Sequence, residues 1–94
     1  MKDNRMTILA ENLVNYSCNV QPGENVLIEV NGVDSAMTEE LVKAVYKAGG
    51  FPFVEINDQR VNRAILMGTS EEHCKRWADY DAYRMQNMDA YIGI

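Results

Sequence analysis

The chain has 94 residues, of which 47% are apolar and 24% are charged, and its formal net charge is −5. This length allows a single domain, and the composition is that of an ordinary globular protein. Its nine Lys and Arg residues are scattered and matched by nearby acids, which argues against the basic stripe that a nucleic-acid-binding surface requires.

Membrane and secretion signals are also not indicated. The apolar runs are far shorter than the ~20 residues that span a bilayer, and the N-terminal segment MKDNRMTILAENL has polar residues where a signal peptide has an apolar centre. Cys18 and Cys74 stand far apart, as expected for two reduced thiols rather than a disulfide framework. We therefore expect a cytoplasmic protein with no membrane partner.

The first predicted element is a helix that Asp3 or Asn4 can cap. Asn19 suits the left-handed conformation that often ends a helix. Residues 21–24, QPGE, predict a turn, because proline fixes φ at its second position and glycine tolerates positive φ at its third. Helical spacing places one stripe of side chains towards the core, and these are Met6, Leu9, Ala10, Leu13, Val14 and Ser17.

A strand, a helix and a second strand follow. Residues 25–30, NVLIEV, are short and nearly all apolar, as in a strand that is covered on both faces. Asp34 or Ser35 can cap the next helix, which Gly49 ends. Residues 53–56, FVEI, form the second strand. Short links between these elements predict a βαβ unit, with parallel strands and a right-handed crossover. The buried face of this helix is predicted to contain Met37, Leu41, Ala44, Val45 and Ala48.

The remaining sequence predicts two helices and a third strand. Residues 60–67 form a short helix. Thr69 and Glu72 have the spacing of a capping box, which opens a longer helix that runs to about Asn87. Residues 90–94, AYIGI, have the apolar character of a strand entering a core.

These elements predict an α/β fold with three layers. Its centre is a short parallel sheet of about three strands, which starts like a Rossmann or flavodoxin domain and carries about four helices. Sheets have five or six strands on average, so we interpret residues 1–94 as a single incomplete domain, the N-terminal part of a longer protein. An exposed strand edge and an aromatic surface predict self-association, for example as a dimer.

Polar residues follow the first two predicted strands. The carboxyl ends of parallel strands are where ligands gather in open sheets, so these residues are candidates for contact with a ligand or a second domain. Capping and turn formation explain the same residue types, and both interpretations stay open. The candidates are Asn31, Asp34, Ser35, Asn57 and Asp58.

Motifs for nucleotide or metal chemistry are lacking in the sequence. Gly32 alone follows the first predicted strand, so the glycine-rich dinucleotide fingerprint is incomplete. His73 is the one histidine, and the adjacent Cys74 diverges from it by about 100° on a helix. This geometry argues against a shared metal ion or a Cys–His nucleophile. We expect no catalytic residue, no metal ligand and no bound cofactor in this chain.

Three segments, taken in order, resemble one known family. They are LAENLVNYSCNVQPGENVLIEV, LVKAVYKAGGFPF and TSEEHCKRWADYDAYRMQNMDAYIGI, which begin at Leu9, Leu41 and Thr69. The family is that of the thermophilic-type metallo-aminopeptidases, which includes aminopeptidases T and S. The similarity extends over nearly the whole chain.

This resemblance implies a parent enzyme that removes N-terminal residues from peptides. Family members use two divalent ions, such as zinc or cobalt, which lower the pKa of a bridging water. Their Glu, His and Asp ligands and their catalytic acid lie in a later part of the protein, and no position here matches them. The resemblance therefore implies that this piece is structural and inactive alone, with a C-terminal catalytic domain as its partner.

Two functions other than that of an aminopeptidase part stay open. One is a non-enzymatic interaction module that pairs through its exposed sheet edge. The other is a small-molecule-binding domain of the flavodoxin-like type.

Overall fold

The computed structural model describes residues 4–32 and 35–94. Helix α1 (Asn4–Asn12) runs into a π-helical turn, η1 (Leu13–Ser17), which precedes strand β1 (Asn25–Asn31). Helix α2 (Ser35–Lys47) and strand β2 (Phe51–Asn57) follow. Helices α3 (Gln59–Gly68) and α4 (Glu71–Met85) then lead to strand β3 (Ala90–Gly93). The predicted caps Asp3 and Asp34 lie outside the described residues.

The three strands form a parallel sheet with the order β2-β1-β3. Pairing continues past β3, because the Ile94 N–H donates to the Glu29 carbonyl at 3.0 Å and the Ile94 carbonyl accepts from the Asn31 N–H at 2.9 Å. The last segment therefore lies in the sheet, at its edge. Within the described ranges, the α/β class, the three parallel strands and the four α-helices are confirmed.

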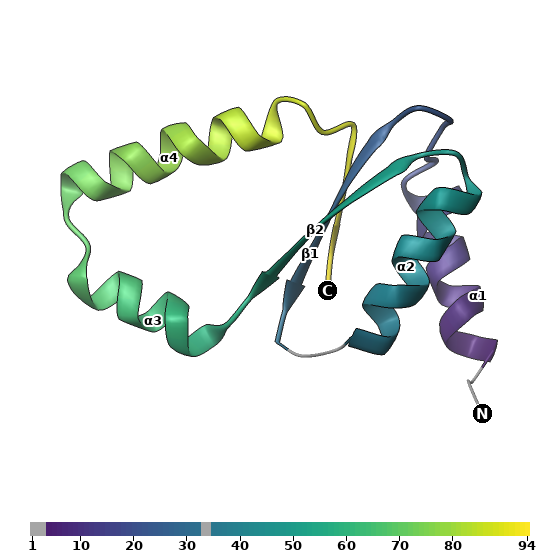
Figure 1. The fold of residues 1–94 in the computed structure, drawn as a ribbon, viewed down its shortest axis with the longest axis horizontal. Coiled ribbons are helices and arrows are strands. Elements are labelled where there is room, and N and C mark those ends of the chain that lie inside the picture. Colours follow the sequence, from purple (N-terminus) through teal and green to yellow (C-terminus); the bar gives the residue numbers. More distant parts are fainter. Residues whose placement is uncertain (1–3, 33–34) are drawn as a thin grey trace.

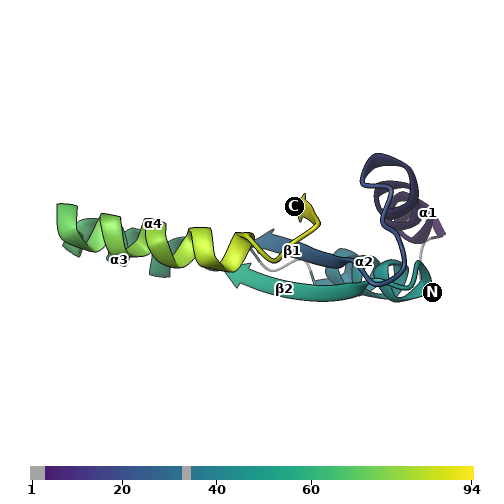
Figure 2. The ribbon, with the colours of Figure 1, turned by 90° about the horizontal axis from the view of Figure 1, so that it is seen from above.

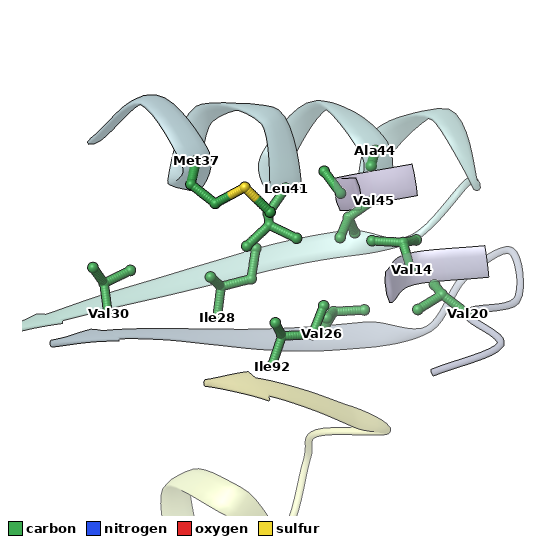
Figure 3. Packing of buried hydrophobic residues seen from close by; sticks show 11 residues of the cluster. Val14, Val20, Val26, Ile28, Val30, Met37, Leu41, Ala44, Val45 and Ile92 are labelled. Atoms are coloured by element: carbon green, nitrogen blue, oxygen red, sulfur yellow. The ribbon is translucent and has the colours of Figure 1, made fainter. Parts of the chain in front are cut away.

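Helix α2 packs against one face of the sheet (Figure 3), and α1 packs against α2. Alternate side chains of β1 point into this core, where Val26 and Ile28 are fully buried beside Leu41 of α2. Burying a large aliphatic side chain contributes about 1.5–3 kcal/mol, so this core joins α1, α2 and the sheet. Its members are Ala10, Val14, Val20, Val26, Ile28, Val30, Met37, Leu41, Ala44, Val45 and Ile92.

The first predicted helical stripe is only partly correct. Ala10 and Val14 are fully buried, whereas Leu9 is exposed. Ser17 is exposed as well, and it lies in the π-helical turn, which has more residues per turn than an α-helix and shifts the side chains after Asn12 out of the predicted register. Asn19 does adopt the predicted left-handed conformation, with φ of 48°.

A buried carboxylate connects the two helices of the core. The Glu40 side chain in α2 accepts a hydrogen bond from the Thr7 hydroxyl of α1 at 3.2 Å, and Lys43 lies at 3.8 Å from the same carboxylate. Lys47 of α2 also forms an ion pair with Glu11 of α1 at 3.1 Å. Because buried polar groups need partners, the Glu40 contact helps to fix how α1 lies on α2.

The described residues form two layers rather than the expected three. Every residue of α3 and α4 is described, and none of them is buried. Figures 1 and 2 show that these two helices project beyond the strands instead of covering the sheet. The sheet face opposite α1 and α2 therefore carries no helical layer within residues 4–32 and 35–94.

Strand β2 is longer than predicted and contains a proline. The Phe51 N–H points towards β1, because it donates to the Glu24 carbonyl at 2.8 Å. Successive backbone groups alternate in direction along a strand, so the Pro52 nitrogen faces the edge, where the N–H that proline lacks breaks no ladder hydrogen bond. The strand therefore begins two residues before the predicted start at Phe53 and ends one residue after the predicted end at Ile56.

The end of α2 packs tightly against the predicted turn at residues 21–24. Gly49 has φ of 85°, and the Gly50 N–H donates to the Val45 carbonyl at 3.0 Å, as in a glycine-terminated helix. A Cβ added at Gly49 would lie 3.1 Å from the Pro22 Cβ. At Gly23, where φ is 84°, an added Cβ would meet nothing within 4 Å.

These two glycines give a matched test of the packing. Gly23→Ala carries the left-handed strain alone and should lower the free energy of unfolding by about 1 kcal/mol. Gly49→Ala adds a clash with Pro22 and should lower it by about 2–3 kcal/mol. Urea unfolding followed by circular dichroism measures both values. Equal losses would show that Pro22 moves aside and that the contact is not tight.

Candidate functional site

A groove of about 560 Å³ lies between α3 and α4, next to the carboxyl halves of β1 and β2. Each helix contributes side chains three or four positions apart, which lie on one helical face. The wall from α3 is partly apolar and includes Ile65 and Leu66, and Thr69 closes the groove after α3. The wall from α4 includes His73, Trp77, Asp81 and Arg84.

The floor of the groove is a cluster of charged side chains. Glu29 and Glu55 are direct partners on β1 and β2, so both carboxylates emerge on the same face of the sheet. Like charges placed opposite each other in a sheet are destabilising. Arg84 compensates for them, because its guanidinium forms an ion pair with Glu55 and lies 4.0 Å from Glu29. Its Nη2 also donates to Asp81 at 2.7 Å.

This charge cluster attaches the α3–α4 hairpin to the sheet. Arg84 is in the last turn of α4, and its side chain is 21% exposed. Asn57 extends the network by donating from Nδ2 to the Glu29 carboxylate at 3.0 Å. Because α3 and α4 have no buried residue to hold them, the contact of Arg84 with the strand carboxylates sets where α4 ends relative to β1.

Tyr91 of β3 adjoins the same cluster. Its partial burial raises the pKa of the phenol above its usual value of 10.0, and the Glu29 carboxylate raises it further by charge repulsion and by accepting its hydrogen bond. Arg84 acts in the opposite direction and lowers this pKa. The pKa of Tyr91 therefore depends on the charges of both Glu29 and Arg84.

The outer end of the groove is organised by the start of α4. The predicted capping box is wrong, because Ser70 is the N-cap and its hydroxyl accepts from the His73 N–H at 3.2 Å. The Thr69 hydroxyl instead lies 3.1 Å from His73 Nδ1 and 3.5 Å from Cys74 Sγ. The His73 imidazole and the Cys74 thiol thus both lie next to the Thr69 hydroxyl. This arrangement was not predicted, because adjacent residues on a helix point in different directions. His73 is exposed.

The candidate residues predicted from the strand ends lie in different places. Asn57 lines the groove, and Asp58 caps α3 by accepting hydrogen bonds from the backbone N–H groups of Arg60 and Val61. Asn31 ends β1 and Ser35 begins α2, both exposed, and neither lines the groove. Asp34 lies outside the described residues. The capping interpretation is thus confirmed for Asp58, while ligand contact stays a prediction for the set.

The residues that organise the groove were not among those predicted from the sequence. Glu29 and Glu55 each interrupt an apolar strand, and Arg84 lies on a helix that is rich in other charges. An acidic residue inside a buried strand needs a partner, and this signal was available in the sequence. The identity of that partner depended on how α4 returns to the sheet, which the sequence does not specify.

The groove does not fit a two-metal centre. In the part of the chain that is described, no group of three or more His, Cys, Asp and Glu side chains is placed to hold a metal ion. The carboxylates of the floor surround a guanidinium, which occupies the position that a cation would take. Among the described residues, no helix has the length and apolar character needed to cross a bilayer.

Removing Arg84 should release α4 from the sheet. Arg84→Met leaves two partly buried carboxylates facing each other, so we expect a loss of about 1–3 kcal/mol in the free energy of unfolding, less than the ~3–5 kcal/mol seen for fully buried pairs. The control is Arg76→Met, whose ion pair with Glu72 is highly exposed and should contribute about 0–1 kcal/mol. Adding Glu55→Gln to Arg84→Met should restore part of the loss. A loss no larger than that of Arg76→Met would contradict this role.

The raised pKa of Tyr91 predicts a pH dependence of stability. The neutral phenol is favoured in the folded chain, so its contribution is present below pH 10.0 and is lost as the pH rises through the raised pKa. Subtracting the ultraviolet titration of Tyr91→Phe from that of the wild type isolates Tyr91, and its midpoint should lie above 10.0. Glu29→Gln should move this midpoint down. A midpoint at or below the usual value would refute the coupling.

Comparison with known proteins places the chain in a family. The model of a family described as thermophilic metalloprotease (M29) matches residues 2–94. The fold is similar to that of wild-type AmpT from Thermus thermophilus, with 23% sequence identity and a TM-score of 0.62; the match covers 73% of this chain and 18% of that chain. No match is found among curated proteins. Because the family match extends over nearly its whole length, the chain belongs to the M29 family of thermophilic metalloproteases.

Proposed function

We propose that this chain is the N-terminal α/β part of a longer dinuclear metal-dependent aminopeptidase, which removes N-terminal residues from peptides. The observation that carries the proposal is the family match over residues 2–94. The relative lengths of the two chains also support the proposal, because the structural match covers only 18% of the AmpT chain. A protein of that size has most of its polypeptide outside the region that corresponds to this chain.

The role proposed for residues 1–94 is structural. The charged groups of the groove pair with one another, and Arg84 holds α4 to the sheet. Charged residues that are used to hold elements together support a structural role for this part of the protein. In this proposal, two divalent ions such as zinc or cobalt, together with their ligands, belong to a C-terminal catalytic domain. Asn31, Ser35 and Asp58 lie at the ends of elements, where contact with that domain is possible without disturbing the core.

The cell compartment and the binding partners of the protein are also part of this proposal. We propose a cytoplasmic protein whose parent acts on peptides and which does not bind nucleic acid or membranes. Two free cysteines and a scattered set of basic residues support this view. Self-association of the isolated chain is proposed because β2 and β3 form the two edges of the described sheet.

The proposal makes a direct prediction about activity. The purified 94-residue chain, supplied with Zn²⁺ or Co²⁺, should release no product from an aminoacyl-anilide above a buffer control, because its carboxylates surround Arg84 instead of a metal ion. The protein translated from the complete native reading frame should be active in the same assay. Metal-dependent turnover by the 94-residue chain would overturn the structural role, and an inactive complete protein would count against the aminopeptidase assignment.

A further inference from the structure

The two faces of the sheet differ in what covers them. On the face beneath α1 and α2, Val26 and Ile28 of the central strand are 0% exposed. The opposite face carries the alternate residues of the three strands, and we call it the open face. Its residues include Leu27 and Glu29 of β1, Phe51, Phe53 and Glu55 of β2, and Tyr91 of β3.

One apolar row crosses the open face. Leu27 is paired in register with Phe53 on one side and with Tyr91 on the other. Leu27 is only 3% exposed, but Phe53 and Tyr91 are 45% and 48% exposed. The neighbouring Phe51 extends this row and is also exposed. Contiguous exposed aromatic side chains on a sheet face indicate a surface that another element covers.

The path of the chain explains why this face is open. Helix α2 connects β1 to β2 across the face that holds the core. Strands β2 and β3 lie on opposite sides of β1, so the connection from β2 to β3 crosses the sheet in the direction opposite to the connection from β1 to β2. A right-handed crossover in that direction must pass on the open face. Arg84 does contact Glu29 and Glu55 on that face. However, α3 and α4 project beyond the strands (Figure 1) and leave the amino-terminal half of the open face uncovered.

We propose that the open face is the docking surface for an amphipathic helix from the polypeptide that follows residue 94 in a longer M29 protein. This inference rests on the proposed function, because it requires a longer chain. The same handedness rule is consistent with this side of the sheet: a connection from β3 to a further parallel strand beside it continues in the direction of β2 to β3 and passes on the same side of the sheet as the open face, beginning next to Tyr91.

The surface also specifies the chemistry of the docking helix. Its apolar side fills the row of Phe53, Leu27 and Tyr91. Towards the carboxyl ends of the strands, the carboxylates of Glu29, Glu55 and Asp81 surround the single guanidinium of Arg84, which leaves an excess of negative charge. A lysine or arginine on the docking helix complements that excess.

A second copy of this chain is a poorer occupant of the same surface. Pairing two open faces would bring two apolar rows together, but each copy would also add its own excess of carboxylates to the interface. Concentrating like charge at an interface opposes association. A helix that carries a basic residue meets both the apolar and the charged part of the surface.

Hydroxyl-radical footprinting read by mass spectrometry tests the proposal. The probe is applied to the 94-residue chain and to the protein from the complete native reading frame, and oxidation is measured at Phe53 and Tyr91. In the longer protein these rates should fall by about fivefold or more relative to that at Tyr16, because side chains at the centre of an interface are buried. Tyr16 is the aromatic reference, since it lies outside the open face and is 80% exposed.

Matched substitutions provide a second measurement. Phe53→Ser should lower the melting temperature of the longer protein by several degrees more than that of the 94-residue chain, whereas Tyr16→Ser should shift both proteins equally. An equal shift for Phe53→Ser, or Phe53 and Tyr91 rates that stay unchanged in the longer protein, would overturn the docking surface while leaving the proposed function intact. Concentration-dependent protection within the 94-residue chain alone would identify a second copy as the occupant and would also overturn the inference. A reading frame that stops at residue 94 would overturn both proposals.

Discussion

The arrangement of this chain depends on one guanidinium among three carboxylates. Glu29 and Glu55 stand side by side because parallel pairing puts them in register, and without a cation their repulsion would oppose that pairing. Arg84 supplies the cation from the last turn of α4 and also contacts Asp81 of its own helix. The contact explains how a hairpin with no buried residue of its own keeps a defined position relative to the sheet.

The two faces of the sheet are stabilised by different forces. Beneath α1 and α2, fully apolar packing dominates, and the polar contact between Thr7 and Glu40 fixes the helix pair. On the open face, charge pairing at the carboxyl ends of the strands adjoins an exposed aromatic row at their amino ends. This asymmetry is consistent with a chain that belongs to the M29 family and corresponds to a small share of the length of AmpT. The polypeptide that we place on the open face would complete the second layer of helices.

Local chemistry explains which elements were predicted well. The apolar strands, the turn at Gln21–Glu24 and the end of α2 at Gly49 depend on residues that are close in sequence, and each was located correctly or within a few residues. The cap of α4 was misplaced by one residue, because Thr69 and Ser70 are both suitable caps and only the backbone hydrogen bond to Ser70 distinguishes them. The start of β2 was predicted too late because of Pro52, since proline is acceptable in a strand only when its nitrogen faces an edge of the sheet. Which strands form the edges is known only once the sheet is assembled.

The sequence alone determined the α/β class, the parallel βαβ unit and the family, because periodicity, turn residues and ordered motifs are written in consecutive positions. The tertiary structure decided the strand order, the projecting α3–α4 hairpin and the groove between them. It also brought Arg84 to Glu29 and Glu55. These features join residues that are distant in the chain, and their positions follow from how whole elements pack.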